Sequence, residues 1–180
     1  MTDDTSSRTD LARAIFASSH LTGSFLLRSG VRSQEYFDKY RFECTPAILR
    51  EVAHQLVPLL STNTQVVAGL EMGGIPIATA LALETGLPAA FVRKQAKTHG
   101  TCKVAEGPDL DGLQVTVVED VVTSGGQIVL STQDLRAAGA VVTDALCVID
   151  RESGGPEALA EAGIMLHALF TSSDLRPEHG

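Results

Sequence analysis

The segment 117–127 contains the residue types needed to bind a phosphorylated sugar. It reads Val117-Val118-Glu119-Asp120-Val121-Val122-Thr123-Ser124-Gly125-Gly126-Gln127. The glycines let backbone N–H groups approach a phosphate closely, and the N-terminus of a following helix adds a favourable dipole. Glu119 and Asp120 can accept hydrogen bonds from the hydroxyls of a ribose whose 5′-phosphate lies in the turn. The pattern therefore predicts a ribose-phosphate site at the end of a strand.

The alternative for this segment is a capped helix that follows a buried strand, with Glu119 and Asp120 solvated. The segment contains neither of the two commoner phosphate-binding motifs, Gly-x-x-x-x-Gly-Lys and Gly-x-Gly-x-x-Gly. These motifs therefore do not distinguish a capped helix from a phosphate site. Two carboxylates directly before a Thr-Ser-Gly-Gly turn favour the ribose-phosphate interpretation.

A second cluster concentrates positive charge. It reads Arg93-Lys94-Gln95-Ala96-Lys97-Thr98-His99-Gly100. A run of charges is usually a solvated face, but this one opens a stretch of about twenty residues without periodicity, and loops of that length in a compact domain are usually functional. Mobile cations that close over a leaving pyrophosphate would stabilise its developing charge.

A third candidate is Arg151, which directly follows an apolar strand pattern. Its planar guanidinium could bind the ring carbonyls of a pyrimidine. The alternative is a surface arginine paired with Glu152.

Together these motifs resemble the type I phosphoribosyltransferases. Segment 117–127 is similar to their signature for phosphoribosyl pyrophosphate (PRPP), and 93–100 is similar to the Arg-Lys-x-x-Lys-x-His-Gly signature of the orotate-using members. The resemblance implies transfer of the phosphoribosyl group of PRPP to orotate, giving orotidine 5′-monophosphate and pyrophosphate in pyrimidine (UMP) synthesis. It also implies a Rossmann-like α/β fold, a small N-terminal hood and a mobile catalytic loop.

The resemblance also assigns roles to residues. Lys97 is implied to be catalytic, and orotate is implied to contact Thr123, Arg151 and the hood. The residues implied to bind PRPP are Arg93, Lys94, Lys97, His99, Glu119, Asp120, Val121, Val122, Thr123, Ser124, Gly125, Gly126 and Gln127. Mg²⁺ is expected to be carried mainly by PRPP, without a protein metal ligand. The family's active form implies a homodimer in which each loop reaches into the partner's site.

Two positions depart from the family pattern. Arg28 stands in the hood where many relatives have lysine, which keeps the charge and changes its geometry. In the pyrophosphate loop, residues 69–76, Met72-Gly73 replaces the Tyr-Lys of well-known bacterial members. A lysine contact to pyrophosphate is therefore missing. We expect either weaker binding of PRPP or a backbone contact to pyrophosphate in place of the lysine.

The elements that must position these residues alternate along the chain. The segment from Phe25 to Phe37 predicts two strands around a turn, and Thr45-Pro46 predicts a helix start. Strands are then expected at 66–70, 89–92, 115–118 and 140–149, with helices from Gly74 to before Gly86 and from 126 to 138, and a final helix–strand pair ending near Phe170. This order predicts a mainly parallel sheet of about five strands flanked by helices. Residues 1–180 are expected to form one domain, with the hood at about 20–40 and the mobile loop at 93–113.

The composition limits the classes of partner. The net charge is −8, aromatic residues make up 4% and Trp is absent, which argues against a nucleic-acid surface. No apolar run is long enough for a membrane span. Cys44, Cys102 and Cys147 lack metal-ligand spacing, and no secretory segment is apparent, so we expect reduced thiols in a cytoplasmic protein. Two rivals stay open: a purine phosphoribosyltransferase and a PRPP-sensing regulator on the same fold.

Overall fold

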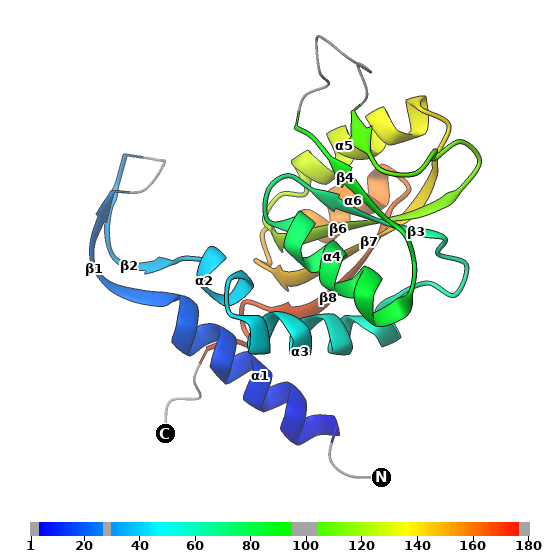
Figure 1. Cartoon of the computed structure of the whole chain (residues 1–180). Helices are drawn as coiled ribbons and strands as arrows, with labels where there is room; N and C mark the ends of the chain where they lie inside the picture. The colour runs from blue at the N-terminus through cyan, green and yellow to red at the C-terminus, as the bar shows by residue number, and fades with distance from the viewer. Residues whose placement is uncertain (1–3, 27–29, 95–103, 177–180) are drawn as a thin grey trace.

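The computed structural model describes residues 4–26, 30–94 and 104–176. At its centre lies a six-stranded sheet in the order β5-β4-β3-β6-β7-β8 (Figure 1). The strands are β3 (Val66–Leu70), β4 (Ala89–Val92), β5 (Ala105–Glu106), β6 (Gln114–Val122), β7 (Val141–Asp150) and β8 (Met165–Thr171). All neighbouring strands pair in parallel except β4 and β5. The expected mainly parallel α/β sheet is confirmed.

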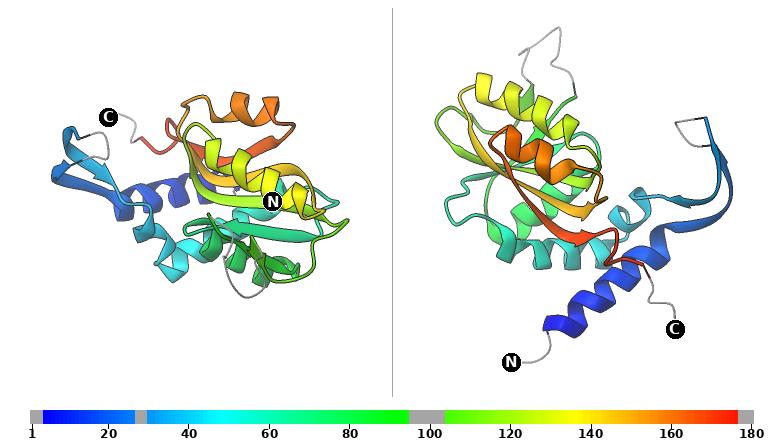
Figure 2. Two further views of the ribbon diagram at one scale, coloured as in Figure 1. Left: turned by 90° about the horizontal axis from the view of Figure 1, so that it is seen from above. Right: turned by 180° about the vertical axis from the view of Figure 1, so that it is seen from behind.

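Helices cover both faces of the sheet, as the turned views of Figure 2 show. They are α1 (Asp4–Ser19), α2 (Tyr40–Glu43), α3 (Pro46–Leu56), the 3₁₀ turn η1 (Val57–Leu59), α4 (Gly74–Thr85), α5 (Gly126–Ala137) and α6 (Gly155–Glu161). Apolar side chains of α1, α3 and α4 pack on one face, and those of α5 and α6 pack on the other. Pro46 occupies the first turn of α3, as predicted. Within the described ranges, no helix is long and apolar enough to cross a bilayer.

The hood is an antiparallel hairpin of β1 (His20–Leu26) and β2 (Arg32–Phe37), which extends from the end of α1 away from the sheet (Figure 1). Across the hairpin the rings of Phe25 and Tyr36 lie 5.5 Å apart, so this aromatic contact packs the two strands together. The predicted hairpin is confirmed, but its first strand begins at His20 and not at Phe25, and Arg28 lies outside the described residues.

The sheet differs from the expectation in two places. β6 does not end at Val118 but continues to Val122, because it keeps pairing with β7 through Glu119↔Cys147 and Val122↔Asp150. The two carboxylates are therefore inside the strand. In addition, part of the expected loop forms β5, an antiparallel neighbour of β4, which raises the number of strands to six.

Candidate active site

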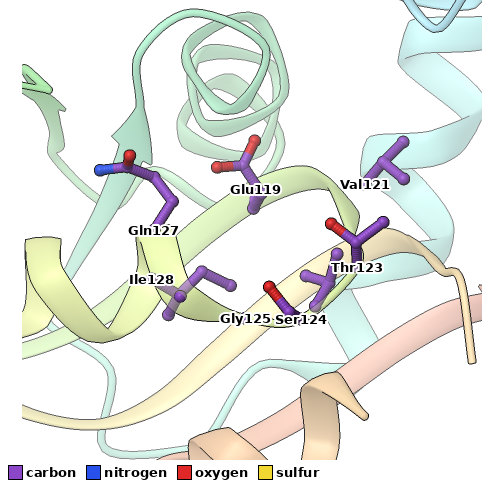
Figure 3. A pocket seen from close by; sticks show the side chains of 9 residues that line it. Glu119, Val121, Thr123, Ser124, Gly125, Gln127 and Ile128 are labelled. Atoms are coloured by element: carbon purple, nitrogen blue, oxygen red, sulfur yellow. The ribbon is translucent and has the colours of Figure 1, made fainter. Parts of the chain in front are cut away.

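The turn between β6 and α5 forms a cavity of 210 Å³ (Figure 3). Its lining residues are Glu119, Val121, Val122, Thr123, Ser124, Gly125, Gly126, Gln127 and Ile128. Gly125 has a φ of 74° and caps α5 without a side-chain hydrogen bond. The first N–H groups of a helix have no intrahelical acceptor, so this end of α5 suits an anion such as a phosphate.

The two carboxylates before the turn are buried. Asp120 is 0% exposed and Glu119 is 9% exposed, which contradicts the alternative in which both are solvated. The backbone N–H of Asp120 donates to Glu119 Oε1 at 3.1 Å, and the N–H of Val121 donates to Asp120 Oδ1 at 2.5 Å. These bonds hold the two side chains in place: Glu119 lines the cavity, whereas Asp120 lies behind it and is fully buried.

Two further residues belong to this cluster, and neither lies in a predicted motif. Lys39, at the start of α2, places its Nζ 2.6 Å from Asp120 Oδ2. Glu43, at the end of α2, is only 6% exposed. Three carboxyl groups and one ammonium group therefore meet below the cavity. Within the described ranges, no group of three His, Cys, Asp or Glu side chains has an arrangement that could hold a metal ion.

The protonation of the cluster follows from burial and from its shared hydrogen bonds. Burial, with a hydrogen bond to Asp120 and its negative charge, raises the pKa of Glu43 and that of Glu119 to about 9. Burial also acts to raise the pKa of Asp120, but hydrogen bonds from Glu119 and Lys39 and the charge of Lys39 outweigh it and lower that pKa. Near neutral pH the cluster therefore holds one carboxylate, Asp120, and one cation, Lys39.

The pyrophosphate loop packs directly against the carboxylates. It connects β3 to α4, and the peptide bond between Glu71 and Met72 is cis. A Cβ atom at Gly73 would overlap the carboxyl group of Asp120, and one at Gly74 would overlap the carbonyl oxygen of Val118. At Gly74 the obstacle is backbone, so only glycine fits there, whereas a side chain at Gly73 would require the Asp120 carboxyl group to shift. In this structure the loop thus presents backbone to the cluster at both positions.

The described part of the cationic segment lies beside this loop. Arg93 follows β4 and forms an ion pair with Glu106 at 3.5 Å, while Lys94 is exposed. The N–H of Arg93 donates to the carbonyl of Val104 at 2.9 Å, so the two ends of the intervening segment are held together. Lys97 and His99 lie outside the described residues.

Arg151 and the hood share a second cavity, of 540 Å³. Its lining residues are Phe16, His20, Glu35, Phe37, Ile149, Arg151, Ser172, Leu175 and Arg176. Glu152 Oε2 accepts hydrogen bonds from the N–H and the hydroxyl of Ser173, at 2.9 and 2.7 Å. The structure thus places Arg151 on the same cavity as the base of the hood, and it ties Glu152 to Ser173 rather than to Arg151.

The chain matches the model of the phosphoribosyl transferase domain over residues 41–166. An orotate phosphoribosyltransferase of Nocardioides sp. (strain JS614) is 50% identical over 165 residues, 92% of each chain. The orotate phosphoribosyltransferase of Mycobacterium tuberculosis with Fe(III) dicitrate superimposes with a TM-score of 0.87 at 29% identity, covering 95% of this chain and 99% of that one. Its complex with PRPP gives a TM-score of 0.81 at 27% identity, covering 94% and 98%.

Proposed function

Because the chain belongs to the phosphoribosyl transferase family, we infer that it is an orotate phosphoribosyltransferase. It transfers the phosphoribosyl group of PRPP to orotate and releases pyrophosphate. The observation that carries this function is the buried pair Glu119–Asp120 before the glycine turn at 123–127, on a fold shared with orotate-using relatives. We place the enzyme in the cytoplasm, as part of pyrimidine nucleotide synthesis.

The donor site follows the order of the strand and the turn. The 5′-phosphate binds to the residues of the turn, Thr123 to Gln127, and the ribose hydroxyls donate hydrogen bonds to Glu119 and Asp120. The pyrophosphate group extends towards the pyrophosphate loop and the cations that begin at Arg93 and Lys94. This order brings the anionic ends of PRPP to N–H groups and cations, and its hydroxyls to the carboxyl groups.

Mg²⁺ would enter the site on PRPP. Hard oxygen ligands suit Mg²⁺, and it retains several waters when it is held by substrate phosphates. As the family resemblance implies, PRPP oxygens and water would supply most of its coordination. When bound, it offsets charge on the departing pyrophosphate.

In the reaction, C1′ gains positive character as its bond to pyrophosphate breaks and the electron pair of that bond leaves with pyrophosphate. N1 of the pyrimidine forms the new bond to C1′ and gives up its proton to pyrophosphate or solvent. Glu119 and Asp120 hold the ribose still while this exchange takes place. We propose that Lys97 stabilises the charge that develops on pyrophosphate, assisted by Arg93, Lys94 and His99.

The simplest test of this function follows the loss of orotate absorbance with PRPP and Mg²⁺. Turnover of orotate supports the assignment. Turnover of a purine base with no reaction of orotate would favour the purine enzyme, and PRPP binding without turnover of any base would favour a regulator.

Arg151 should determine binding of the base rather than of the donor. We expect Arg151→Ala to raise the KM for orotate about tenfold and to leave the KM for PRPP within about twofold, because the arginine lines the cavity at the hood and not the phosphate turn. Arg50→Ala, an exposed position on α3, is the control. Equal increases in both KM values would remove Arg151 from the orotate site.

We further propose a homodimer in which the loop of each subunit completes the partner's site. Arg93 donates a hydrogen bond to Val104, and the ten residues between them could extend at most about 16 Å from that point, at roughly 3.3 Å per extended residue. Mixing inactive Lys97→Ala and Asp120→Ala subunits should restore about a quarter of wild-type activity, because about half of the dimers then contain one intact site. If subunit exchange is verified and no activity returns, each loop serves its own subunit.

A further inference from the structure

Lys39 connects the hood to the ribose-binding strand. It follows β2 and begins α2, yet its ammonium group lies 2.6 Å from Asp120 Oδ2 on β6. The lysine side chain is 34% exposed, whereas the side chain of Asp120 is fully buried. The ion pair therefore joins a partly exposed lysine to a fully buried carboxylate.

The Asp120 carboxylate is fixed on three sides. Oδ1 accepts the N–H of Val121 at 2.5 Å, and Oδ2 faces Lys39. On the third side lies Gly73, where an added Cβ would overlap the carboxyl group. A carboxylate offers about four lone-pair sites, so these two contacts leave others unused, although the side chain is fully buried in this structure. Lys39 and the N–H of Val121 thus each hold one oxygen of the Asp120 carboxylate.

Lys39 also carries the positive charge of the cluster. The groups around Asp120 are Glu119 on its own strand and Lys39 and Glu43 from α2, with Asp38 and Tyr40 close to the latter two. In the described part of the chain, Lys39 is the ion-pair partner of Asp120. A buried carboxylate that loses its counter-charge is strongly disfavoured. The neighbouring pyrophosphate loop does not supply a charge at this point, because glycine stands at position 73 beside the Asp120 carboxyl group.

We propose that Lys39 is a positioning residue for PRPP: it holds the Asp120 carboxylate in the orientation that accepts the ribose hydroxyls. The proposal rests on the proposed function, which places the ribose at Asp120. It adds to the donor site a residue that lies outside both signature segments, 93–100 and 117–127. A lysine that only tethered the hood would instead affect folding or the binding of orotate, which faces the hood.

The test compares Lys39→Met with Arg41→Met. Arg41 lies on the short helix that Lys39 caps, is exposed, and is not the ion-pair partner of Asp120, so its substitution removes an equal charge two residues further along the chain. PRPP binding with Mg²⁺ is measured by calorimetry, alongside the KM for orotate and the melting temperature. We expect Lys39→Met to weaken PRPP binding at least about tenfold, since it leaves Asp120 without its charge partner. Arg41→Met should stay within about twofold, and Lys39→Arg should recover part of the loss.

Equal PRPP affinity of Lys39→Met and the wild type would overturn the proposal. So would a loss of orotate binding that exceeds the loss of PRPP binding, because that result identifies a hood tether. If Lys39→Met does not fold, Lys39→Gln carries the same comparison with a polar, uncharged side chain. Calorimetry separates this test from the test of the proposed function. If the wild-type protein binds PRPP but does not consume orotate, the proposed function is overturned. The comparison of PRPP affinity between Lys39→Met and Arg41→Met can still be made in that case.

Discussion

Asp120→Asn is expected to weaken PRPP binding by at least about 100-fold. The substitution keeps the shape of the side chain and removes the one negative charge that the cluster holds near neutral pH. Hydrogen bonds to charged groups are worth about 1.5–3 kcal/mol, and here Lys39, 2.6 Å away, would also lose its counter-charge. Calorimetry with PRPP and Mg²⁺ measures the effect, and circular dichroism checks that the variant is folded.

Glu43→Gln is the matched control for this experiment. Glu43 lies in the same cluster and is also buried, but burial and its contacts with Asp120 raise the pKa of Glu43 to about 9. Its carboxyl group is therefore protonated near neutral pH, and glutamine replaces one neutral group by another. We expect a change in PRPP affinity of no more than about threefold. Equal losses for the two variants would show that the ribose does not depend on the charge of Asp120.

The order of elements could be predicted from the sequence because local signals mark it. Thr45-Pro46 begins α3, Gly86 ends α4 in the left-handed conformation, and the apolar runs between such signals have the lengths of buried strands. The glycine turn at 123–127 could be predicted for the same reason. Its residues are contiguous, so their spacing alone brings them together at the start of α5.

The end of β6 could not be predicted in this way. Two adjacent acidic residues normally indicate that a strand has reached solvent, and the strand was therefore expected to stop at Val118. Glu119 and Asp120 remain inside the sheet because α2 covers them with a cation and a further carboxyl group. Lys39 stands between Asp38 and Tyr40 in a polar connection, where its local sequence indicates an exposed residue. A contact between residues as far apart in the sequence as Lys39 and Asp120 produces no periodic pattern, so it could not be predicted from the sequence.

Gly73→Lys restores the residue that well-known bacterial relatives have in the pyrophosphate loop, yet we expect it to weaken PRPP binding about 100-fold. From the sequence alone, the added lysine should supply the missing contact to pyrophosphate. In the structure its Cβ would overlap the carboxyl group of Asp120, which cannot move aside because Lys39 and the N–H of Val121 hold it. Overpacking of this kind costs about 1–3 kcal/mol, and here the cost falls on the ribose-binding group.

Leu83→Lys is the control for Gly73→Lys, because it adds the same side chain to an 84% exposed position on α4, the helix that follows the loop. It should bind PRPP as the wild type does.

The double variant Lys39→Met/Gly73→Lys tests whether a lysine from the loop can replace the one from α2. Since the overlap at Gly73 arises from Cβ and not from the charge, the double variant should bind PRPP no better than Lys39→Met. Recovery of affinity in the double variant would mean that the loop moves away from Asp120, and that the site accepts its cation from either segment.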